Sequence, residues 1–270
     1  MKKQKENYSR EHLLYLRGFQ RKNILVNAVR VFILIALLLI WELSARFEWV
    51  NPFITSSPTR ILKTIGELYQ SGSLMTHVGT TLWETLAGFF IAVFLGYSIA
   101  LLLWWSEAAR KISEPYIVVL NALPKIALGP LIIIWCGTGS KAIVFMTVLI
   151  GLIVAILNML NGFMATDENK ILLLRSMGAS KLQILTKLVI PSSLPSLISM
   201  LKINVGMAWI GSIMGEYIVS KAGIGYLIVY GGQVFKLDLV MSAVIILCIL
   251  AAAMYAIVAL LEKLVIKNER

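Results

Sequence analysis

Six long apolar stretches constrain this chain more than any other feature. They lie at about 27–45, 80–104, 116–135, 141–163, 190–219 and 238–262. Each stretch is close to the roughly 20 residues that carry a helix across the hydrocarbon core of a bilayer. A membrane barrel would instead show segments of about ten residues with strict alternation. We therefore predict an all-α, polytopic membrane bundle of about six transmembrane helices.

Composition supports this fold class. Hydrophobic residues make up 59% of the 270 residues and charged residues 14%, whereas soluble domains have about 45–50% and about 25%. These values exclude a soluble enzyme, a disordered chain and a secreted disulfide scaffold. The net charge of +11 therefore has to be concentrated outside the apolar stretches.

The basic residues predict the orientation. Seventeen of the 25 Lys and Arg lie in segments that the six spans put on one side, six lie on the other, and two lie within spans. Because short cytoplasmic loops are rich in Lys and Arg, we expect a multi-pass plasma-membrane protein with both termini in the cytoplasm. The charge is then a topology signal and requires no nucleic acid. We expect a basic cytoplasmic arm at 1–25, a transmembrane domain at 26–264 and a cytoplasmic tail at 265–270.

Two segments between the spans have helical patterns. On the external side, Pro58 begins a short amphipathic helix. On the cytoplasmic side, residues 166–189 predict two helices joined at Gly178, which permits a positive φ without steric cost. Asp167 or Thr166 can cap the first helix, and the second leads to Pro191. We call 166–189 the elbow; its simpler interpretation is an interfacial loop lying on lipid.

The elbow resembles a known motif. Gly178, followed after nine residues by Leu188-Val-Ile190-Pro191, resembles the glycine–proline core of the EAA loop in membrane subunits of ABC importers. Strings similar to the sulfonate, taurine, nitrate and bicarbonate permease branch are Trp41-Glu42, Leu123-Pro124, Trp135-Cys136-Gly137, Asn158, Glu216 and Gly223-Ile224-Gly225-Tyr226. The chain departs from the motif at 172–174, where Leu-Leu-Leu stands in place of Glu-Ala-Ala.

This resemblance implies partners. It implies a homodimer of this chain with two ABC ATPase subunits and an external solute-binding protein, with ATP and Mg²⁺ held by the ATPase and no cofactor bound here. It also implies ATPase contacts along the elbow, at Glu168, Leu172, Leu173, Leu174, Arg175, Gly178, Ala179, Ser180, Leu188 and Pro191. The chain has no G-x-x-x-x-G-K-[ST] loop of its own, so we expect a transport subunit rather than an enzyme.

Charged residues inside spans need a reason, since each costs about 2.5–3.5 kcal/mol at mid-bilayer on insertion scales. Lys125 and Lys202 can line the substrate path and favour an anion. Alternatively, Lys125 pairs with a carboxylate such as Glu84, and Lys202 reaches the interface. Asn204 and Glu216 are further path candidates, Glu216 as part of an external gate or as a partner of backbone amides.

The cargo and two other function classes stay open at this stage. A sulfonate- or nitrate-like anion is the first cargo hypothesis, and a nitrogenous heterocycle the second. A membrane-embedded enzyme would need clustered His, Asp or Arg at one face, and a secondary carrier would show two half-repeats. Neither pattern is evident in the sequence.

Overall fold

The structure is a computed structural model that describes residues 10–266. Residues 1–9 of the predicted basic arm and 267–270 of the predicted tail lie outside the described residues. The described residues form helices joined by short turns, and no strand is found among them. Its α-helices are α1 (Arg10–Arg46), α2 (Pro52–Thr55), α3 (Pro58–Gln70), α4 (Ser73–Trp105), α5 (Glu107–Ala122), α6 (Gly129–Cys136), α7 (Ser140–Met164), α8 (Glu168–Ser176), α9 (Lys181–Ile184), α10 (Ile190–Ser192), α11 (Leu194–Val219), α12 (Ile224–Gln233) and α13 (Leu237–Ile266).

The chain forms two compact units, residues 1–63 and 64–270. In the first, the apolar part of α1 runs from Ile24 to Arg46. Near the end of this helix, the Glu42 carboxylate accepts hydrogen bonds from the Thr59 amide (3.1 Å) and hydroxyl (2.8 Å). The predicted helix beginning at Pro58 is confirmed as α3.

The second unit is built around α4, α7 and α11, which approach closely at small residues. A Cβ on Gly211 of α11 would lie 2.5 Å from Cα of Thr147 on α7, and one on Gly215 would lie 3.1 Å from Cα of Ile143. Such contacts let apolar helices associate in lipid. The small residues Gly206, Gly211, Ser212 and Gly215 predict close helix approach on this span, and it is found at Gly211 and Gly215. A Cβ on Gly206 would meet no atom of the described residues within 4 Å.

The predicted third span is not one straight helix. α5 ends at Ala122, and a 3₁₀ turn η1 (Lys125–Leu128) leads into α6, with a bend of 85° between the two halves. Leu123 is extended (φ −66°, ψ 132°) because the ring of Pro124 clashes with a helical residue before it. Five described helices are long and apolar enough to cross a membrane, and six crossings result if the bent segment counts as one.

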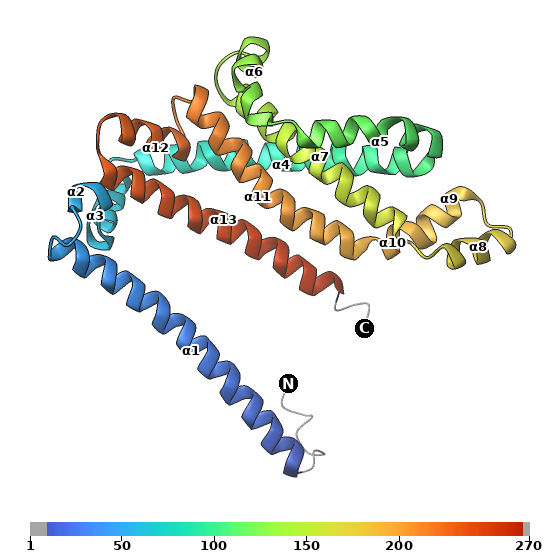
Figure 1. The fold of residues 1–270 in the computed structure, drawn as a ribbon, viewed down its shortest axis with the longest axis horizontal. Helices are drawn as coiled ribbons and strands as arrows, with labels where there is room; N and C mark the ends of the chain where they lie inside the picture. The colour runs from blue at the N-terminus through green and yellow to red at the C-terminus, as the bar shows by residue number, and fades with distance from the viewer. Residues whose placement is uncertain (1–9, 267–270) are drawn as a thin grey trace. The chain divides into compact units, whose positions relative to one another are not determined.

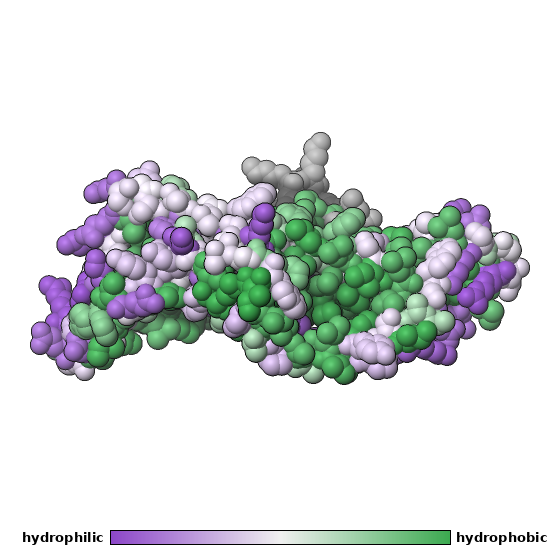
Figure 2. Space-filling model, turned by 90° about the horizontal axis from the view of Figure 1, so that it is seen from above, coloured by the Kyte–Doolittle hydropathy of each residue, from purple (hydrophilic) through white to green (hydrophobic). Residues whose placement is uncertain are grey.

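The ribbon shows how this bent segment runs. Within the second unit, α8 and α9 lie at one end beside the turn from α4 to α5, and the start of α7 lies toward the other end (Figure 1). The bent segment therefore leads from one end of the bundle to the other. Apolar side chains cover the middle of the surface in Figure 2, and hydrophilic ones gather where α8 and α9 lie.

Candidate functional site

Two short helices, α8 and α9, lie on either side of Gly178 in the elbow. The Asp167 carboxylate caps α8 by accepting from the Asn169 amide at 2.9 Å. At the other end Gly178 has φ +81°, its amide donates to the Arg175 carbonyl, and the Ala179 amide donates to Leu174, both at 2.9 Å. This pair of bonds is a Schellman motif, which closes a helix at a left-handed glycine.

A second set of local bonds starts α9. The Ser180 hydroxyl accepts from the Gln183 amide (3.3 Å), and the Gln183 side chain accepts from the Ser180 amide (2.8 Å), a reciprocal capping box. The helix then widens into a π-helical turn, η2 (Leu185–Val189), before α10 and α11. Pro191 follows this π-helical turn, as the second residue of α10, and has no N–H to donate to the preceding turn.

One side of the elbow is anchored in the bundle. Ile184, Leu185 and Val189 are buried with Met159 and Phe163 of α7. The anchored side therefore ties the elbow to the spanning helices.

Four apolar side chains of the elbow are largely exposed. Leu172, Leu173, Met177 and Leu182 have 63%, 61%, 74% and 59% of their surface exposed. These residues lie outside the helices long enough to span a membrane. Exposed apolar side chains on a segment outside the spans suit a docking site.

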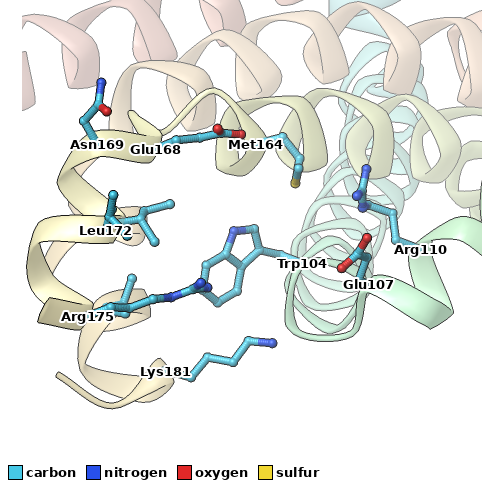
Figure 3. Close-up of a pocket in the computed structure, with 11 residues that line it drawn as sticks. Trp104, Glu107, Arg110, Met164, Glu168, Asn169, Leu172, Arg175 and Lys181 are labelled. Carbon is cyan, nitrogen blue, oxygen red and sulfur yellow. The ribbon is translucent and has the colours of Figure 1, made fainter. Parts of the chain in front are cut away.

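A cavity of about 560 Å³ lies between the elbow and the turn from α4 to α5. Figure 3 shows Arg175 of α8 reaching toward the indole of Trp104, with Lys181 on the same side and Arg110 beside Glu107 on the far wall. The cavity is thus lined by side chains from α4, α5, α8 and α9.

Lys181 links the elbow to the end of α4. Its ammonium donates a hydrogen bond to the carbonyl of Trp105 and lies 5.8 Å and 5.2 Å from the ring centroids of Trp104 and Trp105. Both positions favour a cation, because the carbonyl groups at a helix C-terminus and the faces of indole rings carry partial negative charge.

Glu216 lies at the opposite end of the second unit and is 1% exposed. Its carboxylate accepts from the Gly225 amide at 2.5 Å. The Thr81 hydroxyl accepts from the Ile224 amide at 2.7 Å, and Nδ1 of His77 accepts from the Gly223 amide at 3.0 Å. Three side chains from α4 and α11 therefore cap the first turn of α12.

Steric contacts explain why glycine occupies both positions of the Gly223-Ile-Gly225 string. Gly223 has φ +118°, and a Cβ there would collide with the Glu216 carboxyl. A Cβ on Gly225 would lie 2.8 Å from Cβ of Glu216 and 3.1 Å from the carbonyl oxygen of Ile213. Of the two roles predicted for Glu216, bonding of nearby backbone amides is the one seen.

Glu84 is buried beside this cap. It is 1% exposed, and its Oε2 has no hydrogen-bond partner among the described residues. It also borders a cavity of about 280 Å³ that Ser220 helps to line. The predicted alternative in which Glu84 pairs with Lys125 is not seen, since the Lys125 ammonium donates to the Asn121 carbonyl at 3.1 Å.

The other intramembrane polar residues are engaged within the bundle. Lys202 of α11 forms an ion pair with Glu262 of α13, with 2.5 Å between Nζ and Oε2. The Asn204 side chain is buried and donates to the Met200 carbonyl, one turn back. Asn158 of α7 donates to the Val154 carbonyl of its own helix, because the i−4 carbonyl is the nearest acceptor.

Comparison with known proteins decides the family. Residues 88–267 match the family described as "Binding-protein-dependent transport system inner membrane component". The chain belongs to this family. It is the membrane permease subunit of an ABC importer, and the ATPase is a separate subunit. The competing interpretations, a membrane-embedded enzyme and a secondary carrier, are thereby wrong.

Two relatives and one solved structure show how far the likeness extends. The formylaminopyrimidine transport permease protein ThiX of Halalkalibacterium halodurans is 33% identical, over 70% of this chain and 75% of its own. The putative aliphatic sulfonates transport permease protein SsuC of Escherichia coli is 27% identical, over 90% and 92%. An inward-facing MetNI methionine ABC transporter chain has a TM-score of 0.61 at 20% identity, over 70% of this chain and 96% of that one; it shows the same fold.

The structure gathers some predicted site residues and separates others. The residues predicted to contact an ATPase lie on consecutive elements, from α8 through the turn at Gly178 and η2 to α10. Lys125, Lys202 and Glu216 do not form one cluster, because they bond separately to Asn121, Glu262 and Gly225. The sequence analysis did not predict the roles of His77, Thr81, Trp104 and Glu262. Of these four, only Trp104 had a recognisable sequence signal, since it forms a tryptophan pair with Trp105 at the end of an apolar run.

Proposed function

We propose that this permease works as a homodimer that joins two ATPase subunits through its elbow and receives a small solute from an external binding protein. The observation that carries the coupling role is the elbow itself, a locally capped segment that has exposed leucines and a buried attachment to the bundle. ATP and Mg²⁺ bind to the ATPase subunits. Closure of these two subunits acts on the elbow, and the elbow moves the spans. The residues proposed to contact the ATPase are those from Glu168 to Pro191 named above.

The proposed orientation puts the elbow and both termini in the cytoplasm. It counts α5 and α6 as one broken crossing, in line with their course from one end of the bundle to the other. Residues 26–264 then form the transmembrane domain. The charge bias of the loops supports this orientation.

Gly178→Pro tests the coupling role. Proline fixes φ near −65°, whereas Gly178 has φ +81° and uses its amide to close α8. We expect substrate-stimulated ATP hydrolysis by the reconstituted importer to fall at least tenfold. Gly178→Asn is the matched control, since asparagine tolerates this backbone conformation, and it should retain most of the activity.

Full-rate transport by Gly178→Pro would exclude the elbow as the coupling element. Retained ATPase binding combined with lost stimulation would instead support it, because docking and force transmission would then be separated. If the elbow merely lay on lipid, neither variant would alter co-purification of the ATPase.

Two cargo classes are proposed. The Lys125 ammonium, partly exposed within the bent crossing, favours a sulfonate- or nitrate-like anion. Lys202 is paired with Glu262, so its charge does not support an anionic cargo. The second cargo class is a nitrogenous heterocycle, like the cargo named for the 33% identical relative.

Lys125→Glu separates the two cargo classes. Charge reversal should lower anion uptake at least tenfold, since a carboxylate in the path repels an anion. Lys125→Gln should have a smaller effect. Unchanged uptake of the binding protein's ligand in the Glu variant would leave the heterocycle as the proposed cargo.

A further inference from the structure

A polar cavity of about 330 Å³ lies between the last turns of α7 and the first turns of α11. Two carboxamides on α7 and two hydroxyls on α11 line it, those of Asn158, Asn161, Ser196 and Ser199. Gly162, Ala165 and Pro195 complete the lining, so no charged side chain of the described residues takes part. None of these lining residues belongs to the proposed ATPase contacts or to the path candidates discussed above.

Most of the polar groups in this cavity are available to a ligand. Asn158 uses its amide N–H to bond within its own helix. Within residues 10–266, the side chains of Asn161, Ser196 and Ser199 make no hydrogen bond. Hydroxyls in helices often donate to the carbonyl one turn back, as Ser98 does at 2.8 Å. The cavity therefore presents a carboxamide and two hydroxyls, each of which can both donate and accept.

The walls of the cavity lie where the elbow joins the bundle. A Cβ on Gly162 would lie 2.5 Å from Cβ of Ser196, so α7 and α11 cross in close contact here. The hydroxyls of Thr166, which follows α7, and of Ser192, which ends α10, are 3.1 Å apart. Both chain connections to the elbow therefore begin next to the cavity, and a movement of the elbow moves its walls.

Ser199 also belongs to a stripe of α11 that this chain leaves partly uncovered. Ile203 and Ile210 are 40% and 44% exposed, and a Cβ on Gly206 would meet no described atom within 4 Å. These four positions are three or four residues apart, so they share one face of the helix. A hydrogen-bonding cavity on spanning helices faces water or protein rather than lipid. The stripe and the cavity therefore suit the path between two copies of the chain.

We propose that this cavity is a solute site at the cytoplasmic end of the translocation path, and that it takes a neutral, hydrogen-bonding solute such as a nitrogenous heterocycle. The inference rests on the proposed function, since it uses the proposed orientation and homodimer. The carboxamide and hydroxyls match the ring nitrogens and amino groups of a heterocycle. The lining offers a sulfonate no cation, and charge-assisted bonds are the strong contacts for an anion. Because the elbow moves the walls, exit of the solute is tied to the ATPase.

Solute binding to the full-length permease, assembled with its ATPase in nanodiscs, tests this proposal. The probes are a formylaminopyrimidine, as the neutral heterocycle, and ethanesulfonate, as the anion, and saturation-transfer NMR measures their affinities. We expect the pyrimidine to bind the native protein. Asn161→Leu combined with Ser199→Ala should weaken that binding by about tenfold, because two hydrogen bonds are lost without a gross change of shape.

Two further variants serve as controls. Asn27→Leu with Ser98→Ala removes the same two side-chain types from exposed positions of α1 and α4, and should leave the affinity within about twofold of the native value, since neither residue lines the cavity. Asn161→Gln with Ser199→Thr keeps a carboxamide and a hydroxyl. Retained binding in this variant supports the proposal, because it shows that lost hydrogen bonds, not misfolding, weaken the double variant.

Three outcomes overturn the proposal. The first is that the pyrimidine does not bind the native permease, and the second is an unchanged affinity in the variant that lacks Asn161 and Ser199. The third is ethanesulfonate binding that the same variant weakens by about tenfold, since the cavity would then be an anion site. Each outcome leaves the coupling role of the elbow standing, because ATPase co-purification and Gly178→Pro test that role separately.

Discussion

The two ends of the second unit hold their short helices in different ways. The elbow is capped from within: Asp167, Gly178 and Ser180 bond to amides or carbonyls a few residues away. α12 is capped from a distance, and two of its caps, His77 and Thr81, lie 146 and 143 positions away in the chain. The elbow therefore keeps its shape when the spans move, whereas α12 depends on how α4 and α11 are assembled.

Of the variants that test this comparison, Gly225→Ala should lower the stability of the protein most. The new Cβ would lie 2.8 Å from Cβ of Glu216 and 3.1 Å from a backbone oxygen, so we expect a loss of about 2–3 kcal/mol in the free energy of unfolding. Gly232→Ala, on the same helix with open space around it, should be neutral or gain up to about 1 kcal/mol. Thermal unfolding in detergent measures both, and equal effects would show that α12 is not held by Glu216.

Thr81→Val should have an intermediate effect. Valine keeps the shape but removes the acceptor for the Ile224 amide, and an orphaned buried amide costs about 1–2 kcal/mol. Thr80→Val is the neighbouring control, because the Thr80 hydroxyl is exposed and bonds only within its own helix. If the two variants have the same unfolding temperature, the cap from Thr81 contributes nothing to stability.

Ser180→Ala should have the smallest effect. It removes one half of the capping box, worth about 0.5–1 kcal/mol, while the closure at Gly178 and the buried anchors stay in place. Hydrogen exchange of the Gln183 amide should speed up, with no change at α12; Ser176→Ala serves as the control. Accelerated exchange at Ile224 would mean that the two ends are not independent.

The same contrast explains what the sequence could predict. Asp167, Gly178 and Pro191 are local signals, and the elbow follows them closely. The amphipathic helix at Pro58 and the close approach at Gly211 were likewise readable from short-range pattern. The bend at Pro124 was a local signal too, but the apolar run around it suggested a straight crossing; the steric rule for the residue before proline decided the outcome.

Contacts between distant residues could not be read in this way. The pairing of Lys202 with Glu262 joins positions 60 apart, and both residue types are compatible with many partners. The cap of α12 needs the arrangement of α4 against α11, which no periodicity specifies. For the same reason the predicted path residues do not cluster: Lys125, Lys202 and Glu216 bond to different partners, and Oδ1 of Asn204 and Oε1 of Glu216 are buried without a hydrogen-bond partner among the described residues.

The direct continuation of the elbow through η2 and α10 into α11 has a mechanical consequence. At 1.5 Å per residue, the 26 residues of α11 form an arm about 39 Å long. A tilt of about 10° at its start would displace its far end by about 7 Å, by the same geometry. Glu216 lies near that far end. A small rotation of the elbow would therefore move Glu216, the residue that holds α12, by a much larger distance.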